Sequence, residues 1–111
     1  MTIKAGLIRC QQTEDYCPAT TCFTNAREGK GGLEETGPVE IIALNTCGGC
    51  SGKKAISRAM TMKERGAEII IFASCILRGT PGYIDYKCPF GKKLKKLVEE
   101  KTSLEVIEWT H

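Results

Sequence analysis

The sequence lacks the features that would assign it to a membrane or to the secretory pathway. In its 111 residues no apolar stretch approaches the roughly 20 residues needed to span a bilayer. The opening segment MTIKAGLIRC has one lysine and an apolar run too short for a signal peptide, so we expect it to form a core strand. These absences predict a cytoplasmic protein with no membrane partner.

Strong charge and catalytic motifs are missing as well. The formal net charge of +3 is too mild to predict nucleic acid as a partner. The basic segment KKLKK is most simply the solvated face of a helix. The segment GGCSGKKA has the glycines and lysines of a phosphate-binding loop, but it lacks the full G-x-x-x-x-G-K-[ST] pattern. No acid–base pair, nucleophile triad or cofactor fingerprint stands out, so the sequence names no reaction and leaves open whether the protein is an enzyme.

Cysteine is the residue present in excess, with seven in the chain. An odd number of thiols in an expected reducing compartment argues against a framework of disulfides. Dense cysteine in the cytosol indicates metal binding or thiol chemistry. The alternative is that the cysteines are small buried hydrophobic residues.

Four short apolar runs rich in β-branched residues predict strands, and they read IKAGLI, VEIIAL, AEIIIFAS and LEVIEW. Three helical patterns separate them, at residues 18–27, 51–66 and 89–101. The second pattern places Ile56, Ala59 and Met60 on one face of the helix. Strands that alternate with helices, without hairpin signals, predict an α/β fold with a single domain over residues 1–111. We expect a three-layer sandwich with a small, mostly parallel sheet of about four strands and crossover helices.

Each predicted strand ends at a potential metal ligand. The four runs close with LIRC, LNTC, FASC and EWTH, and therefore at Cys10, Cys47, Cys75 and His111. In a parallel sheet all these ends lie on one edge, which is where open α/β folds bind their ligands. The pattern therefore predicts a shared site at that edge.

A second group of cysteines stands at the expected helix starts. Cys17 and Cys88 each precede a proline suited to the first helical position, and Cys50 precedes the helix that follows CGGC. Helix N-termini favour thiolate over thiol. Thiolates bind metals and attack disulfides, so each βα unit is expected to contribute a strand-end thiol and a helix-start thiol.

Geometry limits how many of these residues one metal can hold. Neighbouring strands are about 4.8 Å apart, so four strand ends span roughly 14 Å, too far for one tetrahedral zinc with Zn–S bonds near 2.3 Å. The preferred ligands are Cys10, Cys47, Cys50 and Cys75. The alternates, or ligands of a second site, are Cys17, Cys88 and His111. An iron–sulfur centre is an open alternative.

Taken together, the segments IRCQQTEDYCP, CGGCSGKKA, ASC, CPFGKK and WTH resemble the CGGC domain family, from the first strand to the C-terminus. This resemblance implies metal binding, with zinc suggested by the cysteines and histidine. The family pattern is matched at the seven candidate ligands named above. Cys22 has no counterpart in that pattern, and its place one turn into a predicted helix leads us to expect it in the core.

Different functions would use the same thiols. One is a metal-binding protein, with zinc as the expected metal, that acts as a store, carrier or sensor. Another is a thiol–disulfide oxidoreductase in which Cys47 or Cys50 attacks a disulfide and the other resolves it. A third is an iron–sulfur protein. The sequence identifies no protein partner.

Overall fold

The computed structural model describes residues 3–10, 19–49, 52–73, 76 and 90–110. Strands and helices alternate along this part of the chain, as expected. The strands are β1 (Ile3–Arg9), β2 (Val39–Thr46), β3 (Ile69–Phe72) and β4 (Glu105–Ile107). The helices are α1 (Thr20–Glu28), the short 3-10 helix η2 (Gly31–Leu33), α2 (Lys53–Glu64) and α4 (Gly91–Thr102). None of these helices is long and apolar enough to cross a bilayer.

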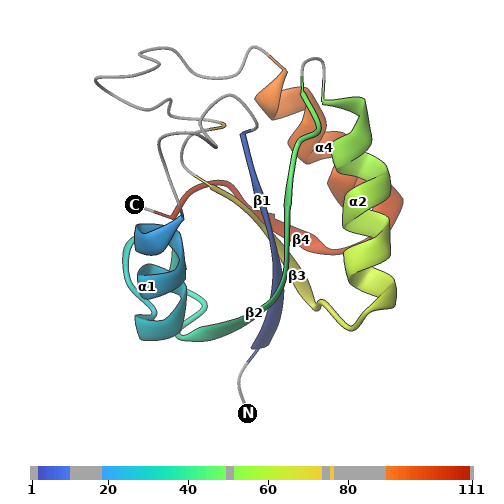
Figure 1. Ribbon diagram of the computed structural model, residues 1–111. Coiled ribbons are helices and arrows are strands. Elements are labelled where there is room, and N and C mark those ends of the chain that lie inside the picture. The colour runs from blue at the N-terminus through green and yellow to red at the C-terminus, as the bar shows by residue number, and fades with distance from the viewer. Residues whose placement is uncertain (1–2, 11–18, 50–51, 74–75, 77–89, 111) are drawn as a thin grey trace, which may run out of the picture.

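The four strands form one parallel sheet in the order β2-β1-β3-β4 (Figure 1). Strand β1 therefore lies inside the sheet, and β2 lies at one edge. The register between β1 and β2 slips by one residue after Ala5, so that Ile42 is an extra residue in β2. The expected parallel sheet is confirmed, and the structure adds the strand order.

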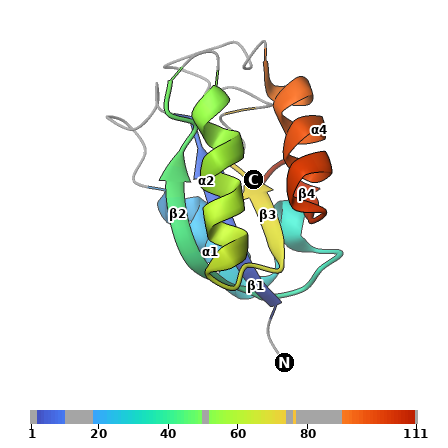
Figure 2. The same cartoon turned by 90° about the vertical axis from the view of Figure 1, so that its right-hand side faces the viewer.

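Helices cover both faces of the sheet, which makes the predicted three layers. Helix α1 lies on one face, and α2 and α4 pack side by side on the other (Figures 1 and 2). Each face has its own apolar core. Leu7 belongs to the core on the α1 side, and its neighbour Ile8 belongs to the core on the other side, as strand alternation requires.

Helix α2 buries a row of residues that only partly overlaps the apolar face identified in the sequence. Its core contacts come from Ala55, Ala59 and Met62, whereas Met60 is 37% exposed. A row with spacings of four and three residues follows one face of a helix, and Met60 lies off that row. Of the three residues that the sequence places together, Ala59 is fully buried, Ile56 packs partly against the core and Met60 is exposed.

The chain order places a topological switch point in the sheet. From β1 the chain crosses to β2 through α1 on one face, and from β2 it crosses to β3 through α2 on the other face. The first connection leads from β1 to its neighbour β2, and the second leads from β2 past β1 to β3 on the other side, so the order of the strands reverses direction at β1. Ligands of open α/β folds bind at such a switch point.

Candidate metal centre

Two of the preferred ligands, Cys10 and Cys47, follow directly after neighbouring strands. Strands β1 and β2 end at Arg9 and Thr46, which are paired in the register. The backbone N–H of Cys47 donates to the carbonyl oxygen of Arg9 over 2.8 Å, so the pairing continues past the last strand residues. Cys10 and Cys47 therefore occupy matching positions one residue further on, at the predicted edge of the sheet.

Both cysteines belong to the core between the sheet and helices α2 and α4. Cys47 is 8% exposed and is part of this cluster, while Cys10 is half-buried and packs against it. Partial burial excludes bulk water from a bound ion and strengthens its attraction to thiolate sulfur. The pair is thus both adjacent and sheltered.

The two glycines of CGGC turn the chain from β2 toward α2. Gly48 and Gly49 have φ values of +78° and +98°, a region that side chains other than glycine rarely occupy. Gly48 also lies against the helix, because a Cβ at this position would be 2.6 Å from the Cβ of Lys54. The N–H of Gly48 donates to Oγ1 of Thr46, which fixes the start of the turn. The glycines therefore allow a thiol-bearing turn to pack closely on the first turn of α2.

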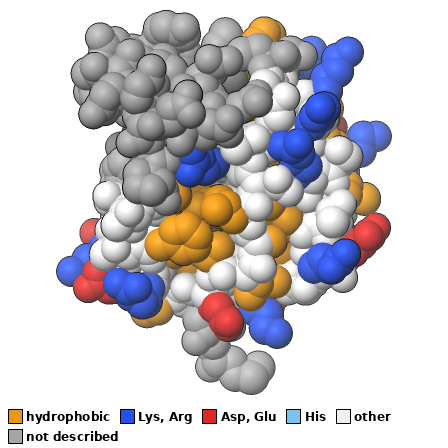
Figure 3. All heavy atoms as spheres, viewed as in Figure 1, with side chains coloured by type: hydrophobic (Ala, Val, Ile, Leu, Met, Phe, Trp, Pro, Cys, Tyr) orange, Lys and Arg blue, Asp and Glu red, His pale blue; other side chains and the backbone are white. Residues whose placement is uncertain are grey.

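The surroundings of this turn are electropositive. Helix α2 begins with Lys53 and Lys54, has no acidic residue in its first turn and no described side chain that caps it. One turn further, Nη1 of Arg58 donates to both the carbonyl oxygen and Oγ1 of Thr46, each over 3.0 Å. On the face shown in Figure 3, basic side chains gather at the upper right over the start of α2, and acidic ones lie lower. Positive potential of this kind favours thiolate, the form of cysteine that binds metal.

The described residues supply two donors for a metal, and their chemistry fits zinc. Thiolates are soft ligands that select zinc over magnesium or calcium. In the part of the chain that the structure describes, no three histidine, cysteine or acidic residues come together as a metal site. The other predicted ligands lie outside the described residues, and they are Cys17, Cys50, Cys75, Cys88 and His111.

Cys22 has a structural environment, as expected. It lies in α1, is 2% exposed and belongs to the core on the opposite face of the sheet. Its Sγ is 3.1 Å from Oγ1 of Thr110, near the other end of the chain. This cysteine joins α1 to the C-terminal segment.

The sequence predicted a fourth strand that ends at His111, but the described part of the C-terminal segment leaves the strand earlier. Strand β4 ends at Ile107, and Thr110 is fully buried against α1 and η2 instead. Its carbonyl oxygen accepts hydrogen bonds from Nδ2 of Asn25 over 2.6 Å and from the N–H of Gly32 over 3.2 Å. Apolar periodicity could not reveal these contacts, because they join polar groups far apart in the sequence.

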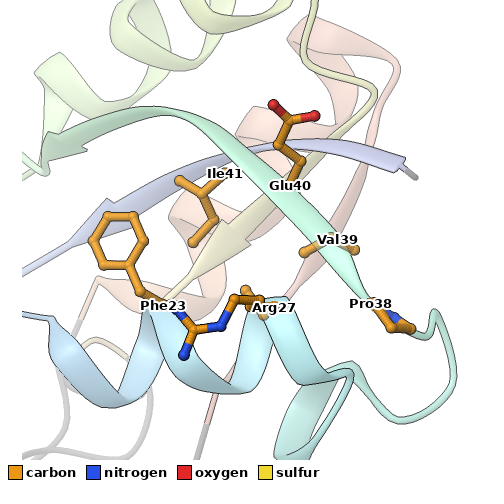
Figure 4. A pocket seen from close by; sticks show the side chains of 7 residues that line it. Phe23, Arg27, Pro38, Val39, Glu40 and Ile41 are labelled. Atoms are coloured by element: carbon orange, nitrogen blue, oxygen red, sulfur yellow. The ribbon is translucent and has the colours of Figure 1, made fainter.

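A hollow lies away from Cys10 and Cys47. It has a volume of about 430 Å³ and lies between α1 and the edge strand β2. Figure 4 shows Phe23 and Arg27 on the helix and Ile41 on the strand lining it. Neither Cys10 nor Cys47 contributes to its walls, so this hollow and the thiol edge are separate features.

Comparisons with known proteins agree with the motif pattern. The chain is 33% identical to an uncharacterized protein of Methanocaldococcus jannaschii over 118 aligned positions, which cover 98% of this chain and 87% of that protein. No solved structure matches the chain significantly. The family model described as the CGGC domain matches residues 4–111, nearly the whole chain. The protein therefore belongs to the CGGC domain family, whose membership suggests metal binding.

Proposed function

We propose that the protein binds zinc through cysteine thiolates at the carboxyl edge of its sheet, and that it serves as a zinc store, carrier or sensor. The observation that carries this proposal is the placement of Cys10 and Cys47 at matching positions after two neighbouring parallel strands. Both thiols would bind the same ion.

The spacing of neighbouring strands suits a pair of zinc ligands. Adjacent strands are about 4.8 Å apart, and two sulfurs on a tetrahedral zinc with bonds near 2.3 Å are about 3.8 Å apart. Cysteines at matching positions on neighbouring strands are therefore close enough to share one zinc ion. We propose Cys50 and Cys75 as the remaining ligands, with Cys17, Cys88 and His111 as alternates.

The electropositive start of α2 supports the same assignment. Lys53, Lys54 and the helix dipole lower the cost of keeping two thiolates close together. A zinc ion then neutralises the remaining negative charge. We further infer a cytoplasmic location, because thiolate ligands stay reduced there.

Metal analysis of the protein purified without air and without a tag tests this function. We expect close to one zinc per chain in the native protein and in Cys22→Ser, and substantial zinc loss in Cys10→Ser and Cys47→Ser. Cys22→Ser is the matched control because it removes a thiol on the other face of the sheet.

The same preparation separates the other thiol functions. Iron and sulfide with visible absorption would assign an iron–sulfur centre. Absence of metal together with a reversible disulfide involving Cys47 or Cys50 would assign the site to redox chemistry. Either result would contradict zinc binding.

A further inference from the structure

A second hollow lies between α2 and α4, which pack side by side on one face of the sheet (Figure 2). It has a volume of about 280 Å³ and lies near the residues at which both helices begin. Most of its lining residues are apolar, and they are Ile56, Phe90, Leu94 and Leu97. The others are Lys53 of α2 and Lys93 of α4, so each helix adds one cation to a mainly apolar hollow.

Exposed apolar side chains extend this hollow along the surface. Phe90, which directly precedes α4, is 37% exposed. Met60 is 37% exposed as well, and it lies about one turn after Ile56, on the same side of α2. Single exposed apolar residues are ordinary, whereas a group of them beside a hollow is typical of an interaction site. The groove between the two helices is therefore a candidate docking surface.

The first two turns of both helices carry charge of one sign. They contain no acidic residue, and their basic residues are Lys53, Lys54, Arg58, Lys92, Lys93, Lys95 and Lys96. Among the described residues, the one ion pair of this group joins Lys95 to Glu108. The acidic residues of α2 and α4 lie in their last turns, and they are Glu64, Glu99 and Glu100. An occupant of the hollow therefore meets an excess of positive charge.

The size of the hollow and the spread of the lysines indicate what kind of partner fits. Sites for drug-sized ligands have volumes of roughly 300–1,000 Å³, so this hollow is suited to a single apolar side chain. Lys54, Lys92 and Lys96 are exposed and lie outside the hollow, so they would face several negative charges around that side chain. A protein segment with carboxylates on either side of one apolar residue supplies both features.

Two other polyanions fit this surface less well. A membrane is bound by apolar side chains that protrude into it, whereas this surface is hollow. Single-stranded nucleic acid stacks its bases on several aromatic side chains, and among the described residues Phe90 is the one aromatic residue that lines the hollow.

We propose that the groove between α2 and α4 docks an acidic segment of a partner protein. One large apolar side chain of the partner enters the hollow, and its carboxylates pair with the surrounding lysines. In such interfaces a buried apolar anchor supplies affinity, and the charged rim supplies specificity and rapid association. Because α2 begins soon after the CGGC segment, the partner lies near the thiol edge. Docking requires no metal, so it succeeds or fails independently of zinc binding.

Binding of a defined peptide to the full chain tests this surface. The probe is a short fluorescein-labelled peptide in which glutamates flank one central phenylalanine, and fluorescence anisotropy measures its binding. We expect saturable binding that weakens severalfold at high salt, because ions screen exposed charges. Binding should also weaken when alanine replaces the phenylalanine of the peptide, since the hollow then loses its anchor.

Lys93→Glu should weaken peptide binding by about tenfold, because it replaces an attraction at the hollow with a repulsion. The variant should fold, since Lys93 is exposed and a negative charge in the first turn of a helix is favourable. Lys101→Glu is the matched control. Lys101 is exposed in the last turn of the same helix, so the control has the same net charge and should bind the peptide as the native protein does.

A second pair of variants tests the apolar anchor. Phe90→Ala should weaken peptide binding severalfold, because Phe90 lines the hollow. Phe23→Ala is its control, since Phe23 is also 37% exposed but lies in α1, on the other face of the sheet. This control should leave peptide binding unchanged.

Three results would overturn the proposal. They are the absence of saturation at peptide concentrations up to about 1 mM, equal losses in Lys93→Glu and Lys101→Glu, and equal binding by Phe90→Ala and Phe23→Ala. The same titration is made with a fluorescein-labelled thymidine oligonucleotide and with vesicles of phosphatidylserine and phosphatidylcholine. Tighter binding of either one, lost in Lys93→Glu, would assign the surface to nucleic acid or to a membrane and contradict a protein partner.

Discussion

Cys47 and Cys22 are both buried, yet the structure gives them opposite surroundings. Cys22 lies within α1, and its sulfur contacts the hydroxyl of Thr110 in the core of one face. Cys47 follows the last residue of β2, at the position that matches Cys10, beside a turn of two glycines and an electropositive helix start. The comparison teaches that burial alone does not separate a cysteine in the core from a proposed metal ligand. The two cysteines differ in their position relative to a strand end.

The largest effect is expected on zinc affinity, when serine replaces Cys47 in one variant and Cys22 in another. Cys47→Ser should weaken zinc binding about 100-fold, because a structural zinc site with a total of roughly 10–16 kcal/mol shared among four ligands loses about 3 kcal/mol with one of them. Cys22→Ser should leave the zinc affinity unchanged. Competition with a chromophoric chelator measures both, and equal losses in the two variants would remove the distinction between the faces.

The next largest effect is expected from substitutions in the turn between Cys47 and α2, which should lower the stability of the fold. Gly48→Ala puts a Cβ 2.6 Å from the Cβ of Lys54 and also strains a φ of +78°. Gly37→Ala strains a nearly identical φ of +77° with nothing within 4 Å of the new Cβ.

We expect a loss in unfolding free energy of about 1 kcal/mol for Gly37→Ala and about 2–3 kcal/mol for Gly48→Ala, since only the latter adds overpacking to backbone strain. Urea unfolding measures the difference. Zinc affinity should fall only in Gly48→Ala, and equal stabilities of the two variants would show that the turn does not pack on α2.

A smaller effect is expected at Arg58, which holds the end of β2. Arg58→Met removes the two hydrogen bonds to Thr46 and should lower the unfolding free energy by about 1–2 kcal/mol. Arg65→Met, at the exposed end of α2, makes the same change of charge and should have little effect. Because Thr46 precedes Cys47, zinc affinity should fall severalfold in the first variant alone.

The smallest effect is expected on the face of the sheet that contains Cys22. Asn25→Ala removes the 2.6 Å hydrogen bond to the carbonyl oxygen of Thr110 and should cost about 1 kcal/mol of stability. Zinc content should stay the same, because the change lies on the Cys22 side of the sheet. Zinc loss in this variant would link the C-terminal segment to the metal site.

Local sequence patterns predicted the strands, the helices and the edge of the sheet at which the candidate ligands lie. Alternating strands and helices predict a parallel sheet, and parallel strands bring their carboxyl ends to one edge, so the placement of Cys10 and Cys47 on the same edge follows from their positions after two apolar runs. Their adjacency depends in addition on the pairing of β1 with β2. The strand order did not follow, because β1 can pair with β2 and β3 in more than one arrangement that satisfies the same pattern.

The features that the sequence could not predict depend on contacts between distant segments. Met62 rather than Met60 is buried because α2 packs against β1 and α4, and the spacing of methionines allows either row. Thr110 lies against α1 because of hydrogen bonds to Asn25 and Gly32. The burial of Arg9, the last residue of β1, was likewise invisible, since strand alternation gives the face of a side chain but not what covers it.

The most direct test of a zinc site built on Cys10 and Cys47 is X-ray absorption at the zinc edge of the zinc-loaded protein, with both serine variants beside it. We predict a shell of sulfur ligands at about 2.3 Å that loses one sulfur in Cys10→Ser and one in Cys47→Ser, and stays complete in Cys22→Ser. A shell of nitrogen and oxygen alone, or a sulfur shell that neither Cys10→Ser nor Cys47→Ser changes, would contradict the account.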